Sequence, residues 1–327
     1  MANRFSIAMC TYNGAGYVAE QLASIAAQTR APDELVVCDD CSVDETVRVV
    51  ERFAASVGFH VALHVNERNL GSTRNFEQAI GLCSGGLIAL SDQDDVWMPR
   101  KLERMEEVFD RQPGVGLVFT DAEIVDEALR PLGERLWERV GFDRRMRRLV
   151  GGGRALDVLL PGWTVTGATM AFRSEFRPLV LDIPDNLAMI HDGWVALVVA
   201  AVAGVAFIDE PLIKYRQHSR QQIGAPKKKK AGAGLGEIRA ALVRSNPYGG
   251  LIEIGGRVRQ RLVERHDDFD SGHALLLLDA RLKHLRAREA MPARRVRRLR
   301  PVLRELLSWR YHLYSKGVYS AVKDLLV

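Results

Sequence analysis

Three short stretches of the sequence concentrate polar side chains that could do chemistry: residues 11–14, 39–42 and 91–97. The third carries Asp92, Asp94 and Asp95 within four residues. Packed carboxylates repel one another and raise each other's pKa unless a cation lies between them. Oxygen ligands of this kind suit Mg²⁺ or Mn²⁺. The cluster therefore predicts a divalent metal site, although aspartates that cap a following helix would show the same spacing.

The surrounding pattern predicts how these stretches are brought together. Strand-like apolar runs occupy residues 5–10, 35–38, 61–65, 87–90 and 115–119, and helical spacing occupies 18–26, 47–57, 72–83 and 102–109. This alternation predicts an α/β fold whose parallel strands are joined by crossover helices. Ligands of such sheets bind at the carboxyl ends of the strands. The polar stretches follow the first, second and fourth strands, so we expect them to form one site.

Several other nucleotide-binding and hydrolytic classes lack their signatures in this chain. Residues 14–16 give only a GxG fragment, and neither GxGxxG, GxxxxGK[ST] nor GxSxG occurs. A dinucleotide-binding dehydrogenase, a P-loop NTPase and a serine hydrolase of the nucleophile-elbow type are therefore not favoured. A nucleotidyltransferase would usually carry a basic, glycine-rich loop after the first strand, and residues 11–16 contain no basic residue.

Charge divides the chain into two regions. The chain carries a net charge of +5, but residues 1–225 hold 23 Lys and Arg against 31 Asp and Glu, whereas residues 226–327 hold 23 against 10. The last hundred residues are thus predicted to face something anionic or to cover an acidic surface. Arginines mixed with leucines over 294–309 favour an anionic membrane surface. No nucleic-acid motif is present, so nucleic acid is not expected, and helices that pack on the core with arginines in water remain the alternative.

Cysteine usage and hydropathy predict the compartment. The thiols Cys10, Cys38, Cys41 and Cys83 stand in a chain without a recognisable secretory signal, and the longest apolar run, residues 194–208, has 15 residues. A membrane-spanning helix needs about 20. We therefore expect reduced thiols, a cytoplasmic protein that binds peripherally to the inner face of the cell membrane, and a buried helix followed by a buried strand over 194–208.

The motifs resemble glycosyltransferase family 2. The stretch Thr11–Gly14, with residues 20–22, 24–25 and 28–29, looks like the opening of that family, and residues 38–46 resemble its "DDxSxDxT" stretch. Asn69–Gly71 with Asn75–Phe76 is similar to "NxGxxxNF". Residues 91–97 with Lys101–Leu102 look like "SDQDDxW…KL", a form typical of rhamnosyltransferase-like members. The resemblance extends more loosely to 191–194 and 215–218 and covers about two thirds of the chain.

The resemblance implies a GT-A fold, a mostly parallel sheet flanked by helices, with a helical C-terminal region. It implies inverting transfer of a sugar from a nucleoside diphosphate to an acceptor hydroxyl, with Mg²⁺ or Mn²⁺ as cofactor. The residues implied in donor binding are Thr11, Tyr12, Asn13, Asp39, Asp40, Asn69, Arg74 and Asp92. Asp94, Asp92 and His218 are the implied metal residues, and Asp192 is the implied general base, although an aspartate before a helix is also a good N-cap.

The resemblance also sets expectations for substrate and organisation. It implies a rhamnosyl or related donor on dTDP or UDP, and a glycan or lipid-linked acceptor in bacterial surface polysaccharide synthesis. We expect a catalytic domain over 1–216, with donor binding in 1–120 and the acceptor side in 121–216. A basic, Gly-containing linker over 217–236 and a basic helical region over 237–327 would follow. The alternative is a non-catalytic sugar- or nucleic-acid-binding protein that has the same fold.

Overall fold

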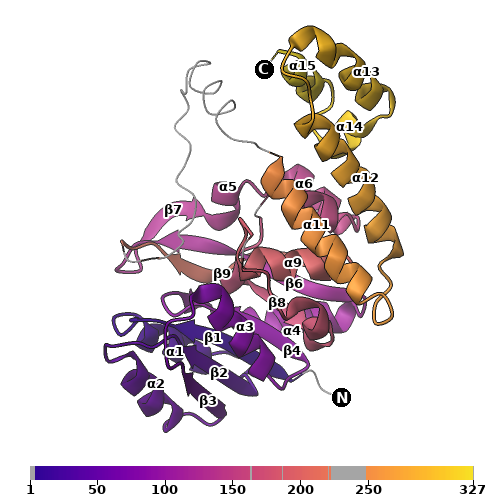
Figure 1. Ribbon diagram of the computed structural model, residues 1–327. Coiled ribbons are helices and arrows are strands. Elements are labelled where there is room, and N and C mark those ends of the chain that lie inside the picture. The colour runs from indigo at the N-terminus through magenta and orange to yellow at the C-terminus, as the bar shows by residue number, and fades with distance from the viewer. Residues whose placement is uncertain (1–3, 163, 186, 220, 222–247, 327) are drawn as a thin grey trace. The chain divides into compact units, whose positions relative to one another are not determined.

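The computed structural model describes residues 4–162, 164–185, 187–219, 221 and 248–326 (Figure 1). The chain divides into two compact units. Unit 1 comprises residues 1–185 and 190–227, and unit 2 comprises residues 186–189 and 228–327. Most of the predicted linker lies outside the described residues.

One sheet organises the described part of unit 1. Its strands are β1 (Phe5–Thr11), β2 (Glu34–Asp39), β3 (His60–Val65), β4 (Leu87–Ser91), β5 (Val96–Trp97), β6 (Val115–Val125), β7 (Pro131–Arg135), β8 (Met170–Arg173) and β9 (Gly204–Arg216). The order across the sheet is β3-β2-β1-β4-β8-β6-β9-β5, and β7 pairs with β6. Strands β3, β2, β1 and β4 are parallel neighbours, as predicted. The α/β class is thus confirmed.

The helices of unit 1 follow the same alternation. They are α1 (Val18–Ala26), α2 (Thr46–Ala54), α3 (Ser72–Leu82), α4 (Lys101–Arg111), α5 (Leu136–Val140), α6 (Arg144–Gly151), α7 (Ala155–Leu159), α8 (Arg177–Val180) and α9 (His191–Ala200), with 3₁₀ turns η1 (Gly167–Thr169) and η2 (Ser174–Phe176). Residues 191–199 of α9 are all buried. A helix that is apolar all round belongs in a core, and α9 lies beside β6 in Figure 1.

The sequence prediction needs correction between residues 165 and 172. The apolar run at 165–172 predicts one strand, but the structure has η1 followed by the short strand β8, which runs antiparallel to β4 and β6. The Gly167 amide donates to the side chain of Asp192 instead of to a neighbouring strand. Extended pairing therefore starts only at Met170. The side chain that accepts from the Gly167 amide belongs to a residue 25 positions away, so the local apolar pattern does not indicate it.

Unit 2 consists of helices in its described part: α11 (Gly249–Glu264), α12 (Gly272–Glu289), α13 (Leu299–Leu307), α14 (Arg310–Tyr314) and α15 (Val318–Leu326), with the 3₁₀ turn η3 (Arg295–Arg298). The Arg-rich helical pattern at 274–290 predicts a helix, which α12 confirms. The helical pattern at 301–326 is divided into three helices, because Trp309 and Gly317 adopt positive φ angles of 60° and 57°. Among all described helices, none combines the length and the apolar character required to cross a membrane.

Candidate active site

The carboxyl ends of three adjacent strands form the candidate site. Thr11 at the end of β1 is in register with Asp39 at the end of β2, and Met9 of β1 is in register with Ser91 at the end of β4. The loops after these strands therefore start from one edge of the sheet, as the sequence predicted.

Asp39 joins the first two of these loops. Its Oδ2 accepts hydrogen bonds from Thr11 Oγ1 at 2.6 Å and Ser42 Oγ at 2.7 Å, and its Oδ1 accepts from the Ser42 amide at 2.8 Å. Asn13 completes the connection, because its amide donates to Ser42 Oγ at 2.8 Å. A carboxylate offers about four acceptor positions. The fully buried Asp39 thus uses three of them within the protein and has capacity for about one more donor.

Asp40 supports the neighbouring loop. Its Oδ1 accepts from the Leu70 amide at 2.7 Å and from Asn66 Nδ2 at 3.0 Å, and its Oδ2 accepts from the Gly71 amide at 2.8 Å. Gly71 has a φ of +81°, a conformation that side chains other than glycine rarely adopt. The resemblance assigned Asp40 to donor binding, and in the structure its contacts are those of a residue that shapes the 66–71 loop.

An open pocket of about 580 Å³ lies beside this loop. It is lined by Arg68, Asn69, Leu70, Arg74, Glu77, Gln78 and Asp185. Arg74 forms ion pairs with Asp185 and Glu77, and their hydrogen bonds raise the pKa of the guanidinium. The structure therefore places Asn69 and Arg74 together, but the acidic residues of the 91–95 loop do not line this pocket.

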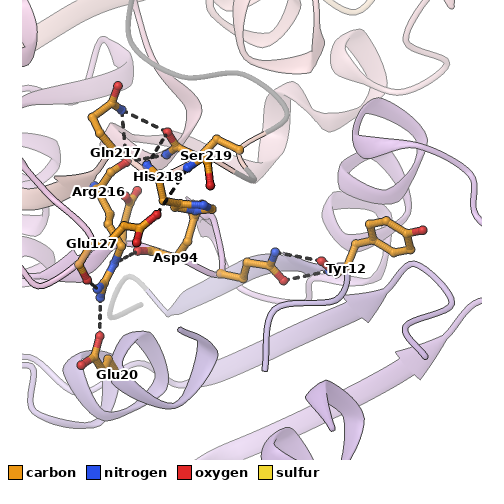
Figure 2. Close-up of polar contacts among 11 residues, drawn as sticks. Tyr12, Glu20, Asp94, Glu127, Arg216, Gln217, His218 and Ser219 are labelled. Carbon is orange, nitrogen blue, oxygen red and sulfur yellow. Dashed lines mark hydrogen bonds and ion pairs between the residues drawn. The ribbon is translucent and has the colours of Figure 1, made fainter. Parts of the chain in front are cut away.

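Gln93 connects the 91–95 loop to the loop after β1. The Tyr12 amide donates to Gln93 Oε1 at 2.8 Å, and Gln93 Nε2 donates to the Tyr12 carbonyl at 3.0 Å (Figure 2). A Cβ on Gly14 would lie only 2.0 Å from Gln93 Oε1, so the absence of a side chain at position 14 makes room for this contact. Sequence reasoning missed Gln93. Two features of the sequence could have indicated it: Gln93 stands between two aspartates, and Gly14 leaves room beside the loop after the first strand.

His218 and Arg216, at the end of β9, approach the same loop. His218 Nε2 lies 2.8 Å from Asp94 Oδ2, and the buried Arg216 donates from Nε to the Asp94 carbonyl at 2.7 Å and from its amide to Asp95 Oδ1 at 3.0 Å (Figure 2). The same guanidinium also contacts the Glu127 carbonyl and Glu20. Arg216 was not among the predicted site residues, yet it fixes the backbone that carries Asp94.

Several carboxylates interact with one another at the 91–95 loop. Burial and the charges of Asp94 and Asp192 raise the pKa of Asp92 to about 7, and burial raises that of Asp95 further above its usual range. The buried Lys101 lies 3.4 Å from the centroid of the Trp97 ring and donates from Nζ to the Ala168 carbonyl. Burial lowers the pKa of Lys101. Lys101 acts on two of these carboxylates, Asp92 and Asp95, whose raised pKa values indicate an environment that favours a further cation.

The donor set fits a divalent ion that also binds substrate. Within the described ranges, no three His, Cys, Asp or Glu side chains are spaced as a complete metal site. Asp94 and His218 would supply one oxygen and one nitrogen ligand, and Asp95 Oδ2 is buried without a hydrogen-bond partner. Mg²⁺ is often held by one or two carboxylates plus substrate phosphates and water. An incomplete side-chain set of this kind is therefore compatible with such a metal.

Asp192 lies in the first turn of α9 and is buried. Ile190, not Asp192, is the N-cap residue, so the N-cap interpretation of Asp192 is wrong. Asp192 accepts from the Gly167 amide at 3.1 Å and from the Gly193 amide at 2.6 Å. Its charge contributes to the raised pKa of Asp92, so the two carboxylates share one electrostatic environment.

The aromatic neighbours of Asp192 are packing residues. His191 stacks on Phe76 with ring centroids 4.0 Å apart, and burial lowers its pKa to about 3. Trp194 is buried and donates from Nε1 to the Val180 carbonyl. Trp97 is buried as well. Tryptophans at these positions could stack on a sugar or pack in the core, and the burial of both indicates core packing.

Comparison with known proteins gives a consistent result. Residues 6–156 match the family model described as glycosyl transferase family 2. An uncharacterized protein of Mycobacterium tuberculosis is 28% identical over 223 residues, which cover 65% of this chain and 59% of that protein. The chain thus spans about three fifths of the length of such relatives. The Escherichia coli UDP-Glc:alpha-D-GlcNAc-diphosphoundecaprenol beta-1,3-glucosyltransferase is 38% identical over 98 residues, 30% of this chain and 38% of that protein.

A solved structure resembles the whole chain in fold. Staphylococcus aureus TarS 1-349 in complex with UDP-GlcNAc has a TM-score of 0.58 at 15% identity, covering 95% of this chain and 88% of that chain. At this level of identity the likeness concerns the fold alone. It agrees with a GT-A-like sheet accompanied by C-terminal helices.

Proposed function

We propose that this chain, whose residues 6–156 match the glycosyl transferase family 2 model, is a glycosyltransferase that moves a sugar from a nucleoside diphosphate to an acceptor hydroxyl with inversion at the anomeric carbon. One observation carries this proposal. Asp94 and His218 meet at the strand ends, and Asp192 acts electrostatically on the same carboxylate cluster. We propose that these groups form the leaving-group site and the base site that direct displacement requires.

Asp192 is the proposed general base. An alcohol is a weak nucleophile at neutral pH, and a carboxylate within about 3 Å can take its proton as the new bond forms. The Gly167 and Gly193 amides fix the orientation of this carboxylate at the start of α9. One base and no covalent intermediate suffice for inversion.

Asp94 and His218 are the proposed holders of Mg²⁺ or Mn²⁺. A bound divalent cation would neutralise the charge that develops on the departing nucleoside diphosphate. Asp92 lies next to this pair, at the position proposed for ribose or a metal-bound water. Arg216 keeps Asp94 in place through the backbone of the loop.

The donor nucleotide is proposed to bind along the loops that follow β1 and β2. Thr11, Tyr12, Asn13 and Asp39 would line the base and ribose, and Asp40 would shape the adjoining loop that carries Asn69, with Arg74 at the edge of the open pocket. The proposed donors are dTDP- and UDP-sugars, among them rhamnose. The E. coli relative, whose name gives UDP-Glc, supports a uridine nucleotide.

The acceptor is proposed to be a glycan or lipid-linked glycan of bacterial surface polysaccharide synthesis, met at the inner face of the cell membrane. The name of the same relative gives a diphosphoundecaprenol acceptor. We further propose a catalytic domain over 1–216 with its acceptor side in 121–216, and a basic helical region after the 217–236 linker.

Nucleotide release from a panel of donors tests the proposal. Purified protein with Mn²⁺ should release a nucleoside diphosphate from one dTDP- or UDP-sugar and form a product of inverted anomeric configuration. Pyrophosphate release would identify a nucleotidyltransferase instead. Donor binding without turnover under any metal or acceptor would favour the non-catalytic sugar-binding alternative.

A further inference from the structure

The outer face of α13 in unit 2 is apolar and exposed. Leu299, Leu303 and Leu307 are spaced four residues apart and therefore lie on one side of the helix. They are 53%, 45% and 80% exposed. Val302 and the buried Glu305 lie on the side of α13 that packs into unit 2. Three exposed leucines in one stripe are unusual for a face that meets only water.

Exposed apolar residues also follow the helix in sequence. Trp309 follows Leu307 by two residues and is 67% exposed, and Leu313 of α14 is more than half exposed. Trp309 has a φ of 60°, so the chain bends at this point. We call Leu299, Leu303, Leu307, Trp309 and Leu313 the α13 face.

The α13 face is bordered by positive charge. Arg300 and Arg304 each follow a leucine of the stripe by one position and are exposed, as are the arginines 294, 295 and 297 that precede the helix. Residues 291–319 contain seven Arg, one Lys and a single acidic residue, Glu305. Glu305 is buried and is bound by His284 and Arg310. No exposed carboxylate therefore offsets the arginines of this stretch.

We propose that the α13 face docks on an anionic lipid bilayer, with its leucines and Trp309 inserted among the headgroups and Arg300 and Arg304 on lipid phosphates. Amphipathic surface helices that bind membranes combine these features: a basic polar side, leucines and an interfacial tryptophan. A protein partner with an acidic groove would satisfy the same charges, but exposed leucines and a tryptophan with arginines next to them match the layered chemistry of a lipid surface. The inference deepens the proposed function, because it names the surface by which the enzyme would reach a lipid-linked acceptor.

Vesicle sedimentation tests the proposal without donor, metal or acceptor. The full chain should bind vesicles containing phosphatidylglycerol, release them as salt rises, and bind pure phosphatidylcholine weakly, because surface charges are screened within about 8 Å at physiological ionic strength. Each basic residue near an anionic leaflet contributes about fivefold to binding. Arg300→Glu/Arg304→Glu should therefore weaken binding by at least about 25-fold. Arg257→Glu/Arg286→Glu, which reverses exposed arginines on α11 and α12, should weaken it much less.

Substitution of the leucines tests insertion separately from charge. Leu303→Ser/Leu307→Ser should reduce binding by about tenfold or more, because buried apolar area is lost. Leu276→Ser is the matched control, since Leu276 is 72% exposed on α12 and lies outside the α13 face. The emission of Trp309, obtained as the difference between the parent and Trp309→Phe, should shift to shorter wavelength when anionic vesicles are added.

Three results would overturn the proposal: equal binding to neutral and anionic vesicles, equal effects of Leu303→Ser/Leu307→Ser and Leu276→Ser, or unchanged Trp309 emission in vesicle-bound protein. Donor turnover in the absence of vesicles separates this inference from the proposed function. Leu303→Ser/Leu307→Ser should leave that turnover unchanged. If the parent protein binds anionic vesicles as described but shows no donor turnover, the proposed function fails and this inference stands.

Discussion

His218 and Asp94 stand 124 residues apart in the chain, and their side chains meet with Nε2 2.8 Å from Oδ2. The contact is made possible by β9, which ends at Arg216 beside the 91–95 loop. A histidine that follows the last strand by two residues and an aspartate contributed by the loop after β4 thus form one pair. In the proposed mechanism this pair would provide two ligands for a cation and leave the other positions to substrate.

Removal of the metal should stop the reaction. We expect excess EDTA to abolish nucleoside diphosphate release and added Mn²⁺ or Mg²⁺ to restore it. Asp94→Asn and His218→Asn should each lower turnover by about 10²-fold or more, because a charge-stabilising group at the leaving group is lost. Glu51→Gln, at an exposed position on α2, is the control. Full turnover in excess EDTA would rule out the metal role.

The contact between Gln93 and Tyr12 predicts a donor-binding defect. Gln93→Ala removes both hydrogen bonds to the Tyr12 backbone, and Gly14→Ala should displace the Gln93 side chain by steric overlap. Each neutral hydrogen bond contributes about 1 kcal/mol. Either variant should therefore raise the donor KM by roughly 5- to 30-fold with a smaller change in kcat.

Gln93→Glu and Gln112→Ala sharpen that measurement. A glutamate at 93 can still accept from the Tyr12 amide but cannot donate to its carbonyl, so the donor KM should be intermediate. Gln112 is exposed at the end of α4, and its replacement should change nothing. If Gln93→Ala lowered kcat and left KM unaltered, Gln93 would not act through the nucleotide loop.

The buried His191 predicts a pH-dependent loss of stability. Burial depresses its pKa from 6.5 to about 3, so the folded protein holds it neutral while the unfolded chain binds a proton below pH 6.5. The contribution of neutral His191 to the free energy of unfolding is complete above pH 6.5 and is lost as the pH falls toward 3. Between pH 7.5 and 5.0, unit 1 should lose about 2 kcal/mol of unfolding free energy relative to His191→Gln.

Urea unfolding at the two pH values measures this difference. In a Trp309→Phe background the remaining tryptophans all belong to unit 1, so their fluorescence reports on that unit. His60→Gln is the control, because His60 is largely exposed on β3. An equal pH dependence of wild type and His191→Gln would show that His191 is not held neutral.

The sequence predicted those parts of the fold that depend on local pattern. The four parallel strands β1 to β4 and the helices between them follow from apolar periodicity, and the polar ends of β1, β2 and β4 follow from the rule for parallel sheets. The helices α5, α6 and α7 were missed because each has at most eight residues, too few for a clear helical period.

Long-range partners could not be read from the sequence. Nothing near Arg216 indicates that it reaches the Asp94 carbonyl, and nothing near Gly167 indicates that it donates to Asp192. Asp39 was expected in donor binding, and the sequence did not indicate that Thr11 and Ser42 would use three of its acceptor positions. These roles depend on contacts across 3 to 122 positions, which local patterns do not encode.

The turnover of Asp192→Asn, measured beside its donor affinity, tests the central claim most directly. Asparagine keeps the size and can still accept one amide hydrogen bond, but it cannot take a proton from the acceptor. The proposed mechanism predicts that turnover falls by about 10²–10⁴-fold while the donor Kd changes little, because donor contacts come from the loops after β1, β2 and β4. A turnover within about threefold of wild type would contradict the role of Asp192 as the base.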